Sequence, residues 1–295
     1  MDIVVVGAGS LGSLLGGLLA REHDVVLVGR EPHVGAVSDG GLAVTGLEQF
    51  RVHPTARTDL PAGGDLAVVA VKAYDTAAVA ADLADCAFDA CLSVQNGLGN
   101  EAILADAVDC PVLAGTCTYG ARLASPGTVE FTGRGELTLG APAGGHSAVA
   151  DDVAGAFRAA GVESTAAEDM PTRLWEKLAV NAAINATTAL ARVENGALAR
   201  QPGDGLADGA ARETARVARE QGVDLPTDRA LSLTEQVIRD TAANRSSMRQ
   251  DIEAGQRTEV DAINGAVVDR AREPVPVNET LARLVRTWER ARDLR

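Results

Sequence analysis

Uninterrupted apolar runs recur through the first half of the chain and alternate with segments of helical character. The first run is Ile3-Val4-Val5-Val6, and comparable runs occupy residues 24–28, 66–71, 91–94 and 111–116. Such runs are typical of strands that are buried on both faces of a sheet. Because helical segments such as residues 11–21 separate them, they predict an α/β fold with a doubly wound parallel sheet.

The pattern changes in the second half of the chain. Residues 128–132 and 136–139 are short strand candidates separated by Gly133-Arg134-Gly135, and we expect them to form an antiparallel hairpin at the sheet edge. From about residue 172 onward the pattern is mostly helical, with prolines and glycines between the segments. Since 295 residues exceed what one core usually supports, we predict two domains, residues 1–168 and an all-helical part, residues 169–295.

A glycine-rich turn follows the first predicted strand. Gly7, Gly9 and Gly12 have the spacing G-x-G-x-x-G, with Ser10 and Leu11 between the last two glycines, and the next helix is predicted from Leu11. The first glycine allows the tight turn, the second lets the backbone approach a pyrophosphate, and the third lets helix and strand pack closely. The helix N-terminus then offers N–H groups to the phosphates. Because the motif stands between a buried strand and a helix, it predicts a dinucleotide site formed by these five residues.

The end of the second predicted strand bears on which dinucleotide binds. An NAD enzyme usually has an acid there, ~20 residues after the glycines, to bind the ribose hydroxyls. Here Gly29 and Arg30 stand at that position, and a guanidinium suits the 2′-phosphate of NADP. Glu31 follows and could bind a hydroxyl instead, and Arg30 could also be a solvated surface base. NADPH is therefore the expected cofactor, and NADH is the alternative.

Only two lysines occur among the 27 basic residues. Lys72 follows a predicted strand, at the end where open α/β sheets bind ligands. Lys177 shares a helical face with Asn181 and Asn185, because the three are spaced i, i+4 and i+8. An amine and two amides make a poor core surface and a good substrate contact. Desolvation can tune a lysine for proton donation, whereas an arginine stays charged, so Lys177 is a candidate acid, although either lysine could be a surface residue.

Polar residues also gather between residues 244 and 265. Asn244, Ser247 and Asp251 fall on one face of a predicted helix, and Gly255 separates this helix from a second one that would carry Glu259. By periodicity alone the stretch is an ordinary amphipathic helix pair, and it does not reveal a site.

Composition narrows the choice of partners and location. The chain carries 41 acidic and 27 basic residues, a net charge of −14, which would repel a phosphate backbone, so we expect no nucleic-acid partner. The sequence shows no bilayer-spanning run and no signal peptide, so we expect a cytoplasmic protein without a membrane partner. The four cysteines form no C-x-x-C pair and the histidines are scattered, so we expect reduced thiols and no metal site.

Taken together, these segments resemble the ketopantoate reductase family, the NADPH-dependent 2-dehydropantoate 2-reductases, nearly from end to end. The resemblance rests on Gly7-Ala8-Gly9-Ser10-Leu11-Gly12, Val71-Lys72-Ala73, Gln95-Asn96-Gly97-Leu98-Gly99, Trp175-Glu176-Lys177-Leu178 with Asn181, Ser246-Ser247-Met248 with Asp251-Ile252, and Arg257-Thr258-Glu259 with Ile263-Asn264-Gly265. It implies a dinucleotide-binding Rossmann domain, residues 1–168, and a helical substrate-binding domain, residues 169–295, like that of 6-phosphogluconate dehydrogenase.

The resemblance also implies roles for single residues. Lys177 matches the general acid, and Glu259 matches a carboxylate that hydrogen-bonds the substrate near its reacting oxygen. The residues that would hold the substrate are Asn181, Asn185, Asn244 and Ser247. The further cofactor contacts would be Lys72 and Asn96 near the nicotinamide and its ribose, and Arg30 at the 2′-phosphate.

The implied reaction is the NADPH-dependent reduction of 2-dehydropantoate to (R)-pantoate in pantothenate and coenzyme A biosynthesis. One alternative is a related reductase of another 2-oxo acid, or an opine-type dehydrogenase. Another is a non-catalytic NADP-binding regulator, against which Lys177 and Glu259 argue, because a sensor needs only the nucleotide-binding half. Both a monomer and a homodimer are compatible with the sequence.

Overall fold

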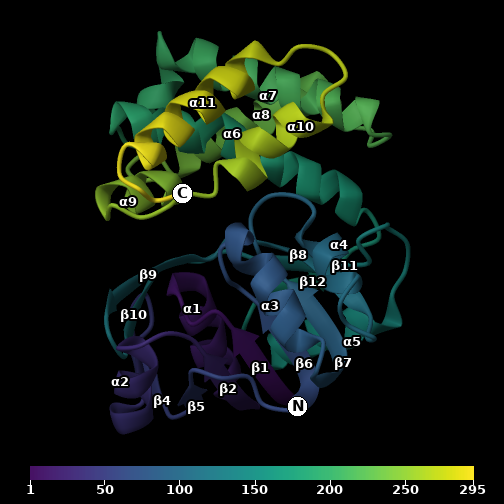
Figure 1. The fold of residues 1–295 in the computed structure, drawn as a ribbon, viewed down its shortest axis with the longest axis vertical. Helices are drawn as coiled ribbons and strands as arrows, with labels where there is room; N and C mark the ends of the chain where they lie inside the picture. The colour runs from purple at the N-terminus through teal and green to yellow at the C-terminus, as the bar shows by residue number, and fades with distance from the viewer. The chain divides into compact units, whose positions relative to one another are not determined.

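A computed structural model describes all residues, 1–295, which form two compact units (Figure 1). The sheet unit comprises residues 1–95 and 99–170, and the helical unit comprises residues 96–98 and 171–295. The helical unit thus includes a short piece of a loop whose neighbours in sequence belong to the sheet unit. None of the helices combines the length and the apolar character that crossing a bilayer requires.

The main sheet has eight strands in the order β12-β11-β8-β7-β6-β1-β2-β5. Its members are β1 (Asp2–Val6), β2 (Asp24–Val28), β5 (Thr55–Arg57), β6 (Gly63–Val69), β7 (Ala87–Ser93), β8 (Val112–Cys117), β11 (Leu137–Gly140) and β12 (Ser164–Ala166). Neighbouring strands are parallel except β8 and β11, which are antiparallel. The prediction of a largely parallel sheet is confirmed.

Helices cover both faces of this sheet, because successive side chains of a strand point to opposite faces. Ile3 and Val5 of β1 share a core with α1 (Ser10–Leu19), α2 (His33–Gly40) and α5 (Ala148–Ala159). Val4 and Val6 share a second core with α3 (Thr76–Leu83) and α4 (Asn100–Ala105). A short 3-10 helix, η1 (Ala73–Asp75), precedes α3. The sheet unit is therefore doubly wound, as its apolar runs predict.

A second, four-stranded sheet has the order β4-β3-β10-β9. Its strands are β3 (Leu42–Gly46), β4 (Phe50–Val52), β9 (Gly120–Ser125) and β10 (Thr128–Gly133). The predicted hairpin of residues 128–132 and 136–139 is wrong, because β10 pairs with β9 and β3 while β11 pairs with β8 and β12. All four residues of β11 are buried, whereas β10 is buried only at alternate positions. The two strands therefore suit different sheets, and residues 134–136 connect one sheet to the other.

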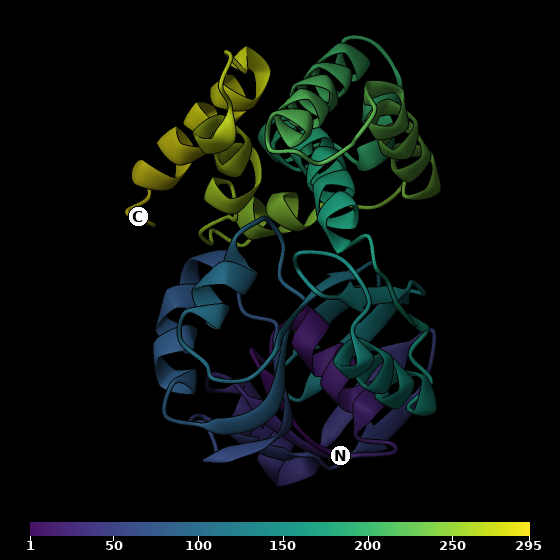
Figure 2. The same ribbon diagram turned by 90° about the vertical axis from the view of Figure 1, so that its right-hand side faces the viewer.

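The helical unit is built around a long helix, α6 (Met170–Ala191). The other elements are η2 (Asn195–Ala199), α7 (Gly203–Glu220), α8 (Thr227–Asp240), α9 (Ser247–Glu253), a π-helical turn η3 (Asp261–Gly265), α10 (Ala266–Arg270) and α11 (Pro276–Arg290). Figure 2 shows the yellow C-terminal helices beside the green helices that follow α6. The core of this unit is rich in alanine, for example at Ala182, Ala186 and Ala211, and these small side chains let the helices pack closely. The predicted all-helical second part is confirmed.

Candidate functional site

The glycine turn between β1 and α1 contains two glycines that the fold itself requires. Gly7 has φ +107°, a conformation that side chains rarely adopt. A Cβ on Gly12 would lie 2.1 Å from the carbonyl oxygen of Gly7. Gly9 differs, because a Cβ there would meet no atom of the protein within 4 Å. Packing therefore explains Gly7 and Gly12, whereas Gly9 leaves its space open to a ligand.

The first turn of α1 completes this cradle. No side chain caps the helix at Gly9, so its first N–H groups stay available to an anion. The hydroxyl of Ser10 accepts a hydrogen bond of 3.0 Å from the backbone N–H of Leu123, which ties β9 to this helix end. Leu11 packs against the core of the sheet unit. The geometry fits the pyrophosphate of a dinucleotide.

Arg30, just beyond β2, makes an ion pair that the sequence did not predict. Its Nη2 lies 2.9 Å from Oδ2 of Asp75, and its side chain is 85% exposed. Asp75 ends the 3-10 helix η1, whose N-cap is Lys72, so the structure brings the turn that follows Lys72 next to Arg30. The carboxylate of Glu31 accepts a hydrogen bond of 3.2 Å from the N–H of Gly35 within α2. Both Arg30 and Glu31 are exposed, and Arg30 is the one of the two whose charge suits a phosphate.

A buried amide network holds the loop that follows β7. Nε2 of Gln95 donates to Oγ1 of Thr76 at 2.7 Å and to the carbonyl of Val71 at 3.2 Å. Oγ1 of Thr76 donates in turn to Oδ1 of Asn100 at 2.9 Å. These bonds join the ends of β6 and β7 to the start of α4, and sequence reasoning missed Thr76 and Asn100. The network fixes the residue after Gln95, which is the candidate Asn96.

Within the helical unit, Asn96 contacts the candidate carboxylate directly. Its Nδ2 donates a 3.1 Å hydrogen bond to Oε2 of Glu259, and Glu259 is only 5% exposed. The approach is close, because a Cβ on Gly97 would lie 2.5 Å from the carbonyl oxygen of Ala262. The structure thus brings together a residue expected near the cofactor and one expected at the substrate. The prediction that Glu259 lies on a helix is wrong, since it occupies a bend before η3.

The face of α6 that carries Lys177 is only partly open to solvent. Lys177 and Asn181 are half-buried, and Asn185, one turn further along, is 6% exposed. The three therefore follow α6 from a more accessible to a buried environment. An ammonium and two amides in such a setting can hold and protonate a polar ligand.

Two hydrogen bonds tie other candidate segments to this part of α6. Nδ2 of Asn264, in the π-helical turn after Glu259, donates to the carbonyl of Ala182 at 3.0 Å. Oγ1 of Thr188 donates to the hydroxyl of Ser246 at 2.8 Å. Both the segment of Glu259 and the segment of Ser247 are therefore anchored along α6, next to Asn181 and Asn185.

The prediction that Asn244 and Ser247 share a helical face is wrong. Helix α9 begins only at Ser247, and the side chain of Ser246 caps it by accepting a hydrogen bond of 3.1 Å from the N–H of Arg249. Serine is a favoured N-cap residue because its hydroxyl satisfies such an N–H. Asn244 lies before the cap, in non-helical backbone, and both candidates are exposed. The prediction of one continuous helix over these residues is wrong.

The thiols offer no rival nucleophile. All four cysteines are free, and Cys91 and Cys117 are buried. Burial, followed by the neighbouring Cys110, raises the pKa of the Cys91 thiol to about 12. Cys91 is therefore protonated at neutral pH, and the thiolate is the nucleophilic form.

Comparisons with known proteins identify relatives over nearly the whole chain. The family model for "Ketopantoate reductase PanE/ApbA" matches residues 3–144, and the model for its C-terminal part matches residues 169–289. A 2-dehydropantoate 2-reductase from Halobacterium salinarum is 45% identical, over 98% of this chain and 99% of that protein.

Solved structures show the same architecture. The crystal structure of a PanE/ApbA family ketopantoate reductase from Ralstonia eutropha matches with a TM-score of 0.91 and 33% identity, over 99% of this chain and 100% of that one. A D-mandelate dehydrogenase solved with NADH and anilino(oxo)acetate matches with a TM-score of 0.94, over 100% of both chains. At 23% identity, the second similarity shows a shared fold alone.

Proposed function

Because the chain belongs to the ketopantoate reductase family, a family of oxidoreductases, we propose that it reduces 2-dehydropantoate to (R)-pantoate with NADPH. The contact that carries this proposal is the hydrogen bond from Asn96 to the buried carboxylate of Glu259. It joins a residue expected at the nicotinamide ribose to one expected at the substrate. The reaction would belong to pantothenate and coenzyme A biosynthesis and would take place in the cytoplasm.

The glycine turn fits the cofactor that this reaction needs. Gly9 leaves open space at the start of α1, and the N–H groups of Ser10 and Leu11 would hold the pyrophosphate. When bound, NADPH supplies a hydride to C2 of the 2-oxo acid. Lys72 and Asn96 would contact the cofactor closer to its nicotinamide end.

Arg30 would select NADPH by pairing with the 2′-phosphate. To do so it exchanges its present partner Asp75 for the phosphate. The exchange costs little, because an exposed ion pair such as this one contributes about 0–1 kcal/mol. A phosphate offers the guanidinium several oxygens in bidentate geometry, so the new pair is the stronger one.

The residues of the helical unit would act on the substrate. Lys177 stabilises the negative charge that builds on the ketone oxygen and delivers the proton that completes the new hydroxyl. The carboxylate of Glu259 accepts a hydrogen bond from the substrate close to that oxygen. The residues that hold the substrate's own carboxylate and hydroxyl are Asn181, Asn185, Asn244 and Ser247.

Steady-state kinetics with a panel of 2-oxo acids test this function. We expect the highest kcat/KM for 2-dehydropantoate with NADPH. The competing substrates are pyruvate, an aromatic 2-oxo acid and, to test for an opine-type dehydrogenase, a 2-oxo acid supplied together with an amino acid. A higher kcat/KM for any of these would identify a different reductase on the same fold, and binding of NADPH without turnover of any substrate would identify a regulator. Size-exclusion chromatography of the same sample decides between a monomer and a homodimer.

A further inference from the structure

The residue before Glu259 is held by the buried carboxylate of Glu289. Thr258 donates two hydrogen bonds to Oε1 of Glu289, one from its N–H and one from Oγ1, both 2.7 Å long. The same hydroxyl accepts a hydrogen bond of 3.2 Å from the N–H of Val260. The residue before Glu259 is thus fixed to α11, and the hydroxyl of Thr258 closes the turn around Glu259.

Glu289 is held in place as firmly as the residue that it holds. Its side chain is 0% exposed, and its Oε2 accepts a hydrogen bond of 2.6 Å from Nε of Arg295. A buried carboxylate is costly unless charge and hydrogen bonds compensate it. Here Arg295 and both donors of Thr258 do so, and they leave Glu289 one defined orientation.

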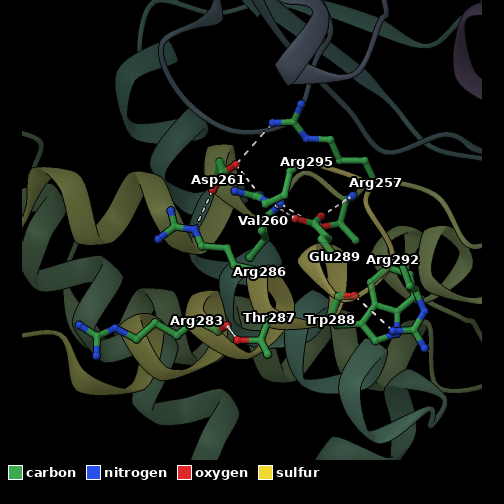
Figure 3. Close-up of polar contacts among 11 residues, drawn as sticks. Arg257, Val260, Asp261, Arg283, Arg286, Thr287, Trp288, Glu289, Arg292 and Arg295 are labelled. Atoms are coloured by element: carbon green, nitrogen blue, oxygen red, sulfur yellow. Dashed lines mark hydrogen bonds and ion pairs between the residues drawn. The ribbon is translucent and has the colours of Figure 1, made fainter.

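A second cluster clamps the chain just after Glu259. Asp261 accepts hydrogen bonds from Nε of Arg286 at 2.8 Å and from Nη2 of Arg295 at 2.6 Å (Figure 3). Nη2 of Arg257 lies 3.7 Å from Oδ2 of Asp261. Burial works to raise the pKa of Asp261, but the hydrogen bonds from Arg295 and Arg286 outweigh it and hold that pKa below its usual value. Asp261 therefore remains a carboxylate at neutral pH, and Arg295 links the two clusters.

The backbone that follows Glu259 needs such support. The π-helical turn η3 starts at Asp261, and the N–H of Gly265 reaches back to the carbonyl of Val260 at 2.8 Å. Turns of this kind are rare and are often found at functional sites. The extra residue in the turn changes the direction in which neighbouring side chains point, so contacts from outside the turn must define where Glu259 lies.

We propose that Thr258, Glu289 and Arg295 are positioning residues that hold the carboxylate of Glu259 at the amide of Asn96, in the orientation that binds substrate. This inference rests on the proposed role of Glu259. None of the three touches substrate, and each acts through the backbone of residues 258–260. A displacement of ~1 Å at a reacting group can cost up to about 10²-fold in rate, so loosening this support has a measurable effect.

The change Thr258→Val tests the proposal, because it removes the hydroxyl and keeps both the shape and the backbone N–H. We expect KM for 2-dehydropantoate to rise and kcat/KM to fall about 10-fold, with the Kd for NADPH unchanged. Thr258→Ser, which keeps a hydroxyl, restores activity. Thr214→Val is the matched control, since Thr214 is fully buried in α7 and donates to the carbonyl of Ala210 at 2.8 Å. Thr214→Val also removes a buried, hydrogen-bonded hydroxyl, but outside the candidate site, so we expect wild-type kinetics.

The same change in a Glu259→Ala background separates positioning from general loss of structure. If Thr258 acts through Glu259, adding Thr258→Val to Glu259→Ala causes no further loss of kcat/KM. An equal loss in both backgrounds overturns the positioning role and leaves the role of Glu259 intact. Unchanged kcat/KM in Glu259→Ala alone overturns both. Arg295→Ala, at a side chain that is only partly exposed, repeats the cycle by removing the guanidinium that pairs with Glu289, and the same pattern is expected.

Discussion

The two units differ in how their candidate residues are spaced along the chain. In the sheet unit the glycine turn is local, since its five candidates all lie between residues 7 and 12 and the turn alone shapes the cradle. In the helical unit the candidates come from segments far apart in the chain, which are anchored to α6 through Asn264 and Thr188. A local site can be recognised in one sequence by its spacing. An assembled site depends on supporting contacts that carry no motif of their own.

The largest expected effect lies in the assembled site. Lys177→Ala should lower kcat by about 10²-fold or more, because it removes the proposed proton donor. The Kd for NADPH, measured by fluorescence titration, should stay unchanged, since the glycine turn is a separate structure. Lys177→Arg is the matched variant, because it keeps the charge and cannot release the proton. Wild-type turnover in Lys177→Arg would show that only a positive charge is needed.

In the glycine turn, two substitutions can separate the glycine needed for packing from the glycine needed for cofactor binding. In Gly9→Ala the new methyl group meets no protein atom, so thermal stability should be retained while the Kd for NADPH rises about 10-fold. In Gly12→Ala the methyl group would lie 2.1 Å from the oxygen of Gly7, so both stability and cofactor binding should fall. Differential scanning calorimetry and titration with NADPH check both variants. Unchanged NADPH affinity in Gly9→Ala would mean that no phosphate approaches this turn.

A smaller effect is expected at Arg30, the residue of the sheet unit that is proposed to distinguish NADPH from NADH. Arg30→Ala should raise KM for NADPH several-fold, because an exposed charge pair contributes at most about 1 kcal/mol, and leave KM for NADH nearly unchanged. Asp75→Asn should lower KM for NADPH, because Arg30 would no longer have a competing carboxylate. Equal changes for both cofactors in either variant would show that Arg30 does not read the 2′-phosphate.

The smallest effect is a pH dependence that belongs to the sheet unit, which contains all four histidines. The Nδ1 atom of His33 accepts from the N–H of Gly127 at 3.1 Å, and Nε2 lies 3.0 Å from the hydroxyl of Ser13. Burial lowers the pKa of His33 below 6.5, so the unfolded chain binds a proton more readily. Its contribution to stability is present above pH 6.5 and is lost as the pH falls through the folded-state pKa.

His33→Gln, which can make both hydrogen bonds without titrating, should reduce that pH dependence of the free energy of unfolding. Circular dichroism over a pH series measures it. A slope identical to that of the wild type below pH 6.5 would contradict this assignment.

The sequence predicts the parts of the fold whose signals are local. Apolar runs such as residues 3–6 and 66–71 predict the main sheet, because strands covered on both faces are apolar throughout. The sequence does not predict the small sheet, because β4 has no fully buried residue and β9 is largely exposed, so neither strand has a continuous apolar run. The hairpin error has the same origin, because a Gly-Arg-Gly connection looks alike whether or not its strands share a sheet.

The candidate site follows the same rule. The glycine turn and the polar face of α6 show in the spacing of residues. The sequence pattern wrongly predicts a helix at Glu259, because a π-helical turn and its anchors have no recognisable periodicity. Glu289 is an acidic residue near the end of an amphipathic helix, a position normally taken by solvated side chains, and only the tertiary structure shows that it is buried.

The central claim is that Lys177 and Glu259 serve one reacting oxygen, although 82 positions separate them in sequence. A double-mutant cycle in kcat/KM for 2-dehydropantoate, with Lys177→Ala, Glu259→Ala and the combined variant, tests it most directly. Residues that work as a unit share one transition-state interaction, so the combined variant should be little worse than Lys177→Ala alone. Strictly additive losses would show that the two residues act independently and would contradict the proposed site.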